Sequence, residues 1–419
     1  MATRRAKRPA SRKRKPSNRT SNSVIRIAVV SDVHAYDELE PDDAPSHCRV
    51  GENDPMKNPL AGLRGFIAEQ QLRADILMCP GDLGDKAHPV AIQHVWSELQ
   101  EIKTLLKAQQ LLTTTGNHDL DSRYSHHFDA KGTLQSLVPQ YPFLDEHAND
   151  KYWARNYVCI TEPGYRIIVL NSSAFHGEGN YEKTKRYEYE QGRVSDFTLG
   201  LIRSELQSSR SPPINILLCH HHPHPHSELR LGEKDLMIGG QALLEMLGSG
   251  QFGSWLVIHG HKHHPKLEYA AGGTSAPIVF AAGSVAAVLY PEIQTICRNQ
   301  FYIIEFPTKA MSTLGFVARF FSWDWLSGMG WRKAAKASKL PATGGFGWRG
   351  DIITLAKVVA SLVKNKSSVM WSDLVVDHPS LEFLLPQDIE HLVQILKANH
   401  SIVSQPDGDC PPTVVGKVR

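Results

Sequence analysis

Five short blocks of polar residues, each directly after an apolar, strand-like run, constrain this chain more than any other feature of its sequence. In chain order they are Asp32-Val33-His34, Gly81 to Asp85, Gly116 to Asp119, His220 to Pro223 and Gly260 to His263. Because α/β sheets gather their ligands at the carboxyl ends of strands, we expect the five blocks to meet at one edge. Carboxylates, imidazoles and a carboxamide in one place suit divalent cations, so the sequence predicts a two-metal site for phosphoester hydrolysis.

The order of these blocks resembles the calcineurin-like metallophosphoesterase superfamily. Its signature D-x-H, G-D-x-x-D, G-N-H-D/E, H and G-H-x-H is matched over residues 24–306. The resemblance implies an α/β (α+β) fold: a two-layer β-sandwich flanked by helices, with loops holding the metal ligands at one edge. It also implies two divalent metal ions, and manganese, iron, zinc or nickel would suit such ligands.

The resemblance also distributes the ligands between the two metals, with Asp82 as the bridge. One metal would be held by Asp32, His34 and His263. The other would be held by Asn117, His221 and His261.

Two further residues receive catalytic roles from the same resemblance. A hydroxide bridging the cations would attack phosphorus in line, and His118 would protonate the leaving alkoxide. His118 follows Asn117 directly and is therefore tethered near the metals. Asp85 is the carboxylate expected to orient the His118 ring.

The histidine run before Pro223 leaves one ligand open. The family needs one imidazole, usually two residues before the proline, which selects His221. On a strand, neighbouring side chains point to opposite faces, so His220 and His222 would point elsewhere unless the strand has already ended. Either could then replace His221. We expect the other histidines here to surround the site or lie exposed in a loop: His220, His222, His224 and His226.

The composition fits an intracellular enzyme. The 419 residues, 41% of them hydrophobic, allow a large core and a smaller second unit, because single cores stop growing near about 250–300 residues. The six cysteines form no Cys-x-x-Cys pair, so we expect free thiols in a reducing, cytoplasmic compartment. No apolar run reaches the roughly 18–20 residues of a membrane span, and no signal-peptide core follows the basic start.

Residues 1–19 carry nine Lys or Arg side chains and no acidic one. Of the 46 basic residues, 37 remain beyond this segment against 43 acidic ones, so all of the net positive charge lies there. We expect a disordered basic tail over residues 1–22. It could tether the protein to nucleic acid or an anionic surface, or it could be a solvated tail with weak, non-specific attraction.

The rest of the chain divides by composition into three parts. Residues 23–308 are expected to form the metallophosphoesterase domain. Residues 309–350 form an aromatic and basic cap with a linker, and the aromatic segment 311–335 favours a helix. Residues 351–419 show helical periodicity and are expected to form a small helical accessory region.

The substrate is expected to be a phosphodiester. The residue after Asp85 is Lys86, where phosphoprotein phosphatases of the superfamily carry arginine, and Asp119 stands where they carry glutamate. The sequence is more similar to the bacterial cyclic-nucleotide phosphodiesterase branch. We therefore expect a dinuclear phosphodiesterase acting on a cyclic nucleotide or similar small diester. A metal-dependent nuclease, a phosphomonoesterase and a non-catalytic interaction module on the same fold remain the alternatives.

Overall fold

The structure is a computed structural model. It describes residues 24–38, 43–124, 128–177, 188–226, 228–229, 235–364, 366, 368–398, 401–404 and 411–417. The basic tail lies outside the described residues, so the prediction made for it stays a prediction. Among the described helices, none combines the length and the apolar content that a membrane crossing requires.

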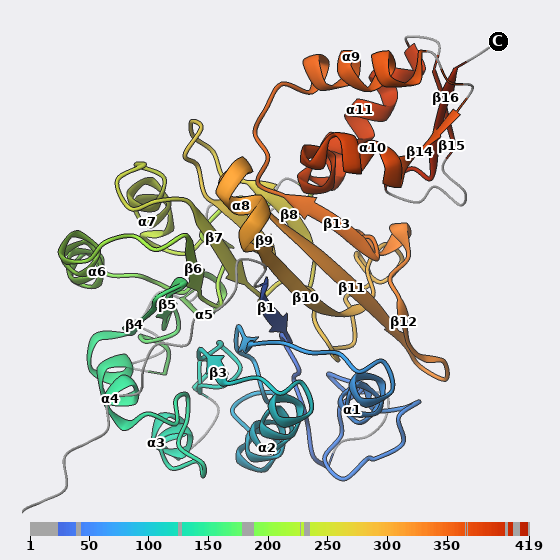
Figure 1. Cartoon of the computed structure of the whole chain (residues 1–419). Helices are drawn as coiled ribbons and strands as arrows, with labels where there is room; N and C mark the ends of the chain where they lie inside the picture. The colour runs from blue at the N-terminus through green and yellow to red at the C-terminus, as the bar shows by residue number, and fades with distance from the viewer. Residues whose placement is uncertain are drawn as a thin grey trace, which may run out of the picture.

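A seven-stranded sheet runs through the middle of the molecule (Figure 1). Its order is β12-β11-β10-β1-β2-β3, and β13 pairs with β11. Because β1, β2 and β3 are parallel, the first three polar blocks emerge at the same edge. The strands are β1 (Val24–Val29), β2 (Ile76–Cys79), β3 (Gln110–Thr113), β10 (Asn299–Pro307), β11 (Ala318–Leu326), β12 (Gly330–Lys333) and β13 (Thr343–Phe346).

A second sheet of six strands packs against the first, in the order β4-β5-β6-β7-β9-β8. Its central strands β5, β6, β7 and β9 are parallel, so the last two polar blocks also leave from one edge. The strands are β4 (Tyr157–Glu162), β5 (Tyr165–Leu170), β6 (Ile214–Leu218), β7 (Trp255–His259), β8 (Lys266–Tyr269) and β9 (Ile278–Ala281).

Alternation along the strands builds the two-layer sandwich that the sequence predicted. In β1, Ile25, Ile27 and Val29 enter the core between the sheets. Ala28, in the same strand, faces the helices outside. Side chains of a strand alternate between its faces, so each sheet buries one face on the other sheet and one face under helices.

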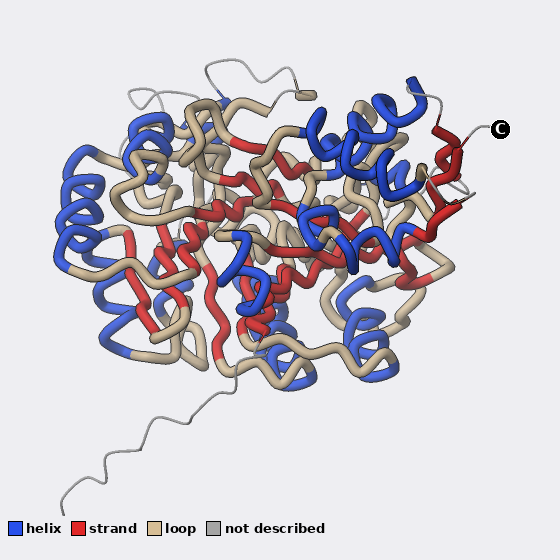
Figure 2. The backbone as a smooth tube through the Cα atoms, turned by 45° about the horizontal axis from the view of Figure 1, so that its top comes forward, coloured by secondary structure: helices blue, strands red, loops and turns tan. Residues whose placement is uncertain are grey.

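Helices cover the outer faces, and Figure 2 shows them around the central strands. Helix α1 (Pro59–Glu69) and helix α2 (Pro89–Leu105) pack on the first sheet. Helix α6 (Asp196–Ser208) and helix α7 (Gly240–Leu247) pack on the second. The other helices of the sandwich are α3 (Ala130–Gln135), α4 (Glu146–Arg155), α5 (Glu188–Gln191) and α8 (Thr308–Leu314).

The prediction of a helix over residues 311–335 was wrong. After the short helix α8 the chain forms β11 and β12, which extend the first sheet beyond β10. Aromatic side chains are favoured in strands, and those of β11 find partners on α1, where the Phe66 and Trp323 rings lie 5.9 Å apart.

The carboxyl-terminal unit has its own core and lies beside the sandwich (Figure 1). It contains more than the expected helices, since β14, β16 and β15 form a small sheet in that order. Glu382 pairs with Arg319 of β11 at 2.8 Å, and Glu390 pairs with Lys336 at 3.2 Å, which ties this unit to the sandwich. Its elements are α9 (Ile352–Val363), β14 (Ser368–Met370), α10 (Trp371–Asp377), the 3₁₀ helix η4 (Pro379–Phe383), α11 (Pro386–Ala398), β15 (Ser401–Ser404) and β16 (Val414–Lys417).

Candidate metal centre

The five polar blocks meet where β1, β2, β3, β6 and β7 end. At this edge the backbone adopts left-handed φ angles at five non-glycine residues: Asp32 (51°), His34 (50°), Asp82 (56°), His261 (85°) and His263 (56°). Such angles are uncommon outside glycine, cost free energy, and concentrate at functional sites. Here they turn the side chains of all five residues inward, where each is buried.

Asp32, His34 and His263 form the first group of ligand atoms, as the resemblance implied. The Nε2 atoms of His34 and His263 lie 3.0 Å apart, and Oδ1 of Asp32 is 3.7 Å from Nε2 of His263. Two imidazole nitrogens that face each other leave room for only one proton between them. A cation held by both lone pairs would satisfy this arrangement.

Asp82 lies between the two halves of the centre. Its Oδ2 atom is 3.3 Å from Nε2 of His34 and 3.3 Å from Nε2 of His220, yet it makes no hydrogen bond within the described part of the chain. The other oxygen, Oδ1, accepts a 2.7 Å hydrogen bond from the backbone N–H of His118. A buried carboxylate oxygen without a hydrogen bond is costly, and a shared cation is the partner that its position fits.

The second half of the centre contains Asn117, His220 and His261. Nε2 of His220 and Nδ1 of His261 lie 2.9 and 3.0 Å from Oδ1 of Asn117. The opposite nitrogens face backbone carbonyls, of Pro80 at 3.0 Å and of Glu190 at 2.8 Å. Because a carbonyl only accepts, those outer nitrogens carry protons. The inner nitrogens converge on the Asn117 oxygen, which also only accepts, and a cation held by the lone pairs of all three atoms would satisfy this arrangement.

His221, the ligand selected from the sequence, lies next to this group but has a different partner. Its Nδ1 is 2.9 Å from Oγ of Ser172, and that oxygen also receives the backbone N–H groups of His220 and His221. The hydroxyl proton of Ser172 is therefore directed at Nδ1, and the proton of the neutral His221 ring must sit on Nε2. A ligand atom of His221 is nevertheless within 4.8 Å of ligand atoms of His220 and His261.

Two glycines and one carboxylate fix the blocks to one another. A Cβ atom on Gly116 would overlap the Asp82 carboxylate, and one on Gly260 would overlap that of Asp32. Asp119 accepts backbone N–H groups from Asp82, Leu83 and Gly116 at 2.9, 2.7 and 2.8 Å. This role of Asp119 was not predicted from the sequence. Its signal was a carboxylate directly after the ligand block that contains Asn117.

The two predicted catalytic residues are in contact. Nδ1 of His118 lies 2.7 Å from Oδ1 of Asp85, and Nε2 lies 3.1 Å from Nη2 of Arg123. A guanidinium can only donate, so in this arrangement Nε2 of His118 is an acceptor and Nδ1–H donates to Asp85. Arg123 was not predicted, because its only signal in the sequence is its place five residues after His118.

The remaining histidines are less exposed than expected. His222, His226 and His264 are buried, and their rings form a chain next to the centre, with centroids 6.0 Å apart for His222 and His226 and 4.5 Å for His226 and His264. His224 is partly buried and lies 3.9 Å from Glu268. These histidines therefore surround the centre, which was the first of the two predicted arrangements, and do not lie exposed in a loop.

The buried carboxylates dominate the electrostatics at His220. Burial lowers the pKa of His220, but the Asp82 and Asp32 carboxylates outweigh that effect and raise the pKa to about 9. Burial also raises the pKa of Asp32 to about 6. The potential that retains a proton on His220 would also attract a metal cation, which would displace that proton on binding.

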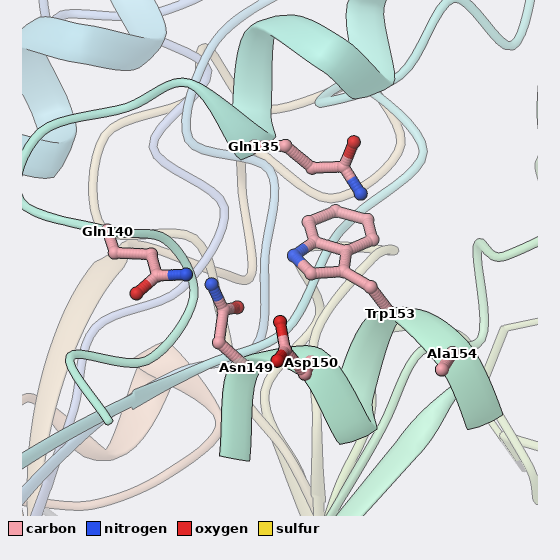
Figure 3. A pocket seen from close by; sticks show the side chains of 6 residues that line it. All are labelled: Gln135, Gln140, Asn149, Asp150, Trp153 and Ala154. Carbon is pink, nitrogen blue, oxygen red and sulfur yellow. The ribbon is translucent and has the colours of Figure 1, made fainter. Parts of the chain in front are cut away.

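A hollow of about 520 Å³ lies outside the metal centre (Figure 3). The lining side chains include Gln135, Gln140, Asn149 and Trp153. The Trp153 ring packs edge-on against Tyr152, at 5.2 Å between centroids, and the Tyr152 hydroxyl accepts the backbone N–H of Thr115. The wall of this hollow thus supports the segment that carries Asn117.

The matching family model is that of the calcineurin-like phosphoesterase, over residues 25–265. The chain belongs to this family. It is therefore a metallophosphoesterase of a hydrolase family, and its fold implies a dinuclear divalent metal centre where the aspartate and histidine clusters lie. A second model, described as wHTH-Calcineurin_assc, matches residues 344–398.

Among curated proteins, this phosphoesterase is similar to one of Rhodococcus erythropolis described as "Probable cyclic nucleotide phosphodiesterase". The two are 29% identical over 196 residues, which are 47% of this chain and 52% of the relative. The match therefore spans about half the length of that relative.

Several solved structures are similar in general fold. The purple acid phosphatase PPD1 of yellow lupin is 15% identical, with a TM-score of 0.46 over 77% of this chain and 54% of that one. A dimetal phosphatase of Danio rerio is 13% identical, with a TM-score of 0.40 over 67% of this chain and 95% of that one. Similarity at this level carries no information about the substrate.

Proposed function

We propose that this phosphoesterase is a dinuclear metal-dependent phosphodiesterase that hydrolyses a small diester such as a cyclic nucleotide. The observation that supports it most is Asp82, whose Oδ2 atom lies 3.3 Å from a histidine of each half of the centre. The preference for a diester rests on the similarity to the Rhodococcus relative.

We assign one metal to Asp32, His34 and His263, with Asp82 shared. The other we assign to Asn117, His261 and His220, which replaces His221 because the lone pair of His220 faces Asn117 and Asp82. When bound, two divalent cations would supply Lewis acidity and an activated water for attack on phosphorus. Manganese, iron, zinc and nickel all suit this mixture of imidazole and carboxylate ligands.

The residues around the metals have roles of their own in this proposal. Asp85 holds the His118 ring through Nδ1, so Nε2 is the atom that would deliver a proton to the leaving alkoxide. Arg123 occupies Nε2 at 3.1 Å, so it must leave that nitrogen before His118 can donate from it. A substrate phosphate is a suitable new partner for the Arg123 guanidinium.

Nucleic acid remains a partner only as a prediction. Residues 351–419 carry eight acidic and six basic side chains, which gives them no excess positive charge with which to bind phosphates.

Free thiols fit the proposed cytoplasmic location, since the described cysteines are unpaired.

The test is hydrolysis of bis(p-nitrophenyl) phosphate and of p-nitrophenyl phosphate by protein loaded with manganese. We expect faster turnover of the diester, loss of activity with a chelator, and recovery when metal is restored. Asp82→Asn should lose most of both metals, whereas a variant that keeps two equivalents and full activity would refute the bridging role. Preference for the monoester would favour a phosphomonoesterase, and inactivity with two bound metals would favour the non-catalytic alternative.

A further inference from the structure

Tyr290 places an aromatic ring directly on the metal centre. Its ring is parallel to that of His263 within 3°, with 5.4 Å between centroids. His263 is buried, whereas Tyr290 remains 49% exposed. One face of the tyrosine ring is thus covered by a proposed metal ligand while much of the residue still faces outward.

The segment around Tyr290 is held in place by its backbone. The Tyr290 carbonyl accepts hydrogen bonds from the N–H groups of Ile293 and Gln294, at 3.0 and 2.9 Å. The N–H of Val288 donates to the Pro45 carbonyl at 2.9 Å. The ring is therefore presented by a fixed turn, which lowers the entropy cost of using it as a binding surface.

The same segment carries two further exposed apolar side chains. Val288 is 46% exposed and Ile296 is 39% exposed, within six residues of Tyr290 on either side. Exposed apolar side chains that gather beside a polar site mark a place where a ligand or partner covers them.

The Arg123 guanidinium and the Tyr290 ring lie against one connected group of histidines. Arg123 contacts His118, whose ring centroid is 4.4 Å from that of His34. Nε2 of His34 lies 3.0 Å from Nε2 of His263, the residue on which Tyr290 stacks. A cation and an exposed aromatic ring thus flank the same half of the metal centre.

We propose that Tyr290 is a stacking platform for a planar aromatic group on the diester, which makes nucleotide-type diesters the preferred substrate class. This inference rests on the proposed phosphodiesterase function. With the phosphate at the metals and near Arg123, one ester substituent would extend over the Tyr290 ring. Aromatic rings stack on nucleobases with little dependence on base identity, so the platform would select for planarity rather than for one base.

The test compares 3′,5′-cyclic AMP with glycerophosphoethanolamine, a diester that has no planar group. Tyr290→Ala should raise KM for cyclic AMP by about 5- to 100-fold, with little change in kcat, and should leave KM for glycerophosphoethanolamine unchanged. Tyr290→Phe should behave like the wild type because it keeps the ring. Thr295→Ala, at an exposed residue of the same segment, is the matched control and should change neither KM.

Two measurements separate stacking from support of His263. Metal analysis should find the wild-type metal content in Tyr290→Ala, and calorimetry should show that the variant loses the affinity advantage of AMP over inorganic phosphate. Equal losses on both diesters, or loss of metal, would overturn the inference and make Tyr290 a support for His263. If the wild type hydrolyses neither diester, the proposed function fails, and the AMP titration alone then decides whether Tyr290 stacks on a base.

Discussion

Replacing His220 and His221 one at a time would decide which of them binds the second metal. In His220→Asn the second metal position loses the only nitrogen of this pair whose lone pair faces both Asn117 and Asp82. Changes to residues that merely support a ligand cost about 10- to 100-fold in metal affinity, so loss of a ligand should cost more than about 100-fold. The variant should bind one metal tightly and the second weakly.

His221→Asn should behave differently. The described side-chain hydrogen bond of His221 is the one to Ser172, and a bond of this kind contributes about 0.5–1.5 kcal/mol. Its loss should weaken the second metal by no more than about tenfold. Ser172→Ala removes the same bond from the other side together with the acceptor of the His220 and His221 backbone N–H groups, so it should weaken the second metal at least as much as His221→Asn does.

The assay is competition for metal against a chromophoric chelator, with elemental analysis after gel filtration. The reasoning predicts two equivalents in His221→Asn and close to one in His220→Asn. The opposite result would restore the assignment made from the sequence, and it would show that the carbonyl of Pro80 does not fix the proton on His220.

Three other substitutions, of Asp119, Arg166 and His226, test buried polar contacts of the fold. Asp119→Ala leaves three buried N–H groups without an acceptor and should lower the free energy of unfolding by at least about 3 kcal/mol, measured by denaturant titration; a loss under 1 kcal/mol would contradict this. Arg166 is buried, with hydrogen bonds of 3.0, 3.1 and 3.1 Å to Asn215, Ser209 and Phe252, so Arg166→Lys should lower Tm although it keeps the charge, and an unchanged Tm would contradict the need for a guanidinium. Burial lowers the pKa of His226 to about 3, whereas the pKa of a histidine in the unfolded chain is about 6.5. The unfolded chain therefore binds this proton first, so the stability that the neutral, buried ring contributes is complete above about pH 6.5 and is lost as pH falls toward 3. His226→Asn should therefore flatten the fall of Tm between pH 7 and 5, where the effect amounts to at most about 2 kcal/mol, and parallel curves for the two proteins would speak against it.

The fold class and most of the centre could be predicted because local signals agreed with the tertiary structure. Apolar strands followed at once by polar blocks place ligands at strand ends, whatever the loops do. For the second metal the resemblance selects His221, two residues before Pro223, and strand alternation was the argument against His220. That argument ends with β6 at Leu218, so it does not apply to the histidine run. After a strand ends, the direction of a side chain depends on φ angles and on distant partners, which one sequence does not reveal.

The aromatic segment near β11 was misread for a related reason. The segment was predicted to favour a helix, whereas β11 buries Phe320 on one face and turns Trp323 toward α1 on the other. When both faces of a strand are covered, its aromatic residues no longer show a simple alternation of polar and apolar side chains. Tyr290 could not be found either, since it reaches the centre only through long-range folding, and Arg123 had no signal beyond its place five residues after His118.

Each proposed metal would hold two parts of the chain together, because its ligands come from both parts. The residues up to β5 supply Asp32, Asp82 and Asn117, and those from α6 onward supply His220 and His263, so each proposed metal position draws on both sides of that boundary. Two fragments cut between β5 and α6 would each carry incomplete sites. Metal would then set how tightly the fragments associate, and the enzyme could be rebuilt as a split reporter whose signal records free metal instead of phosphodiester.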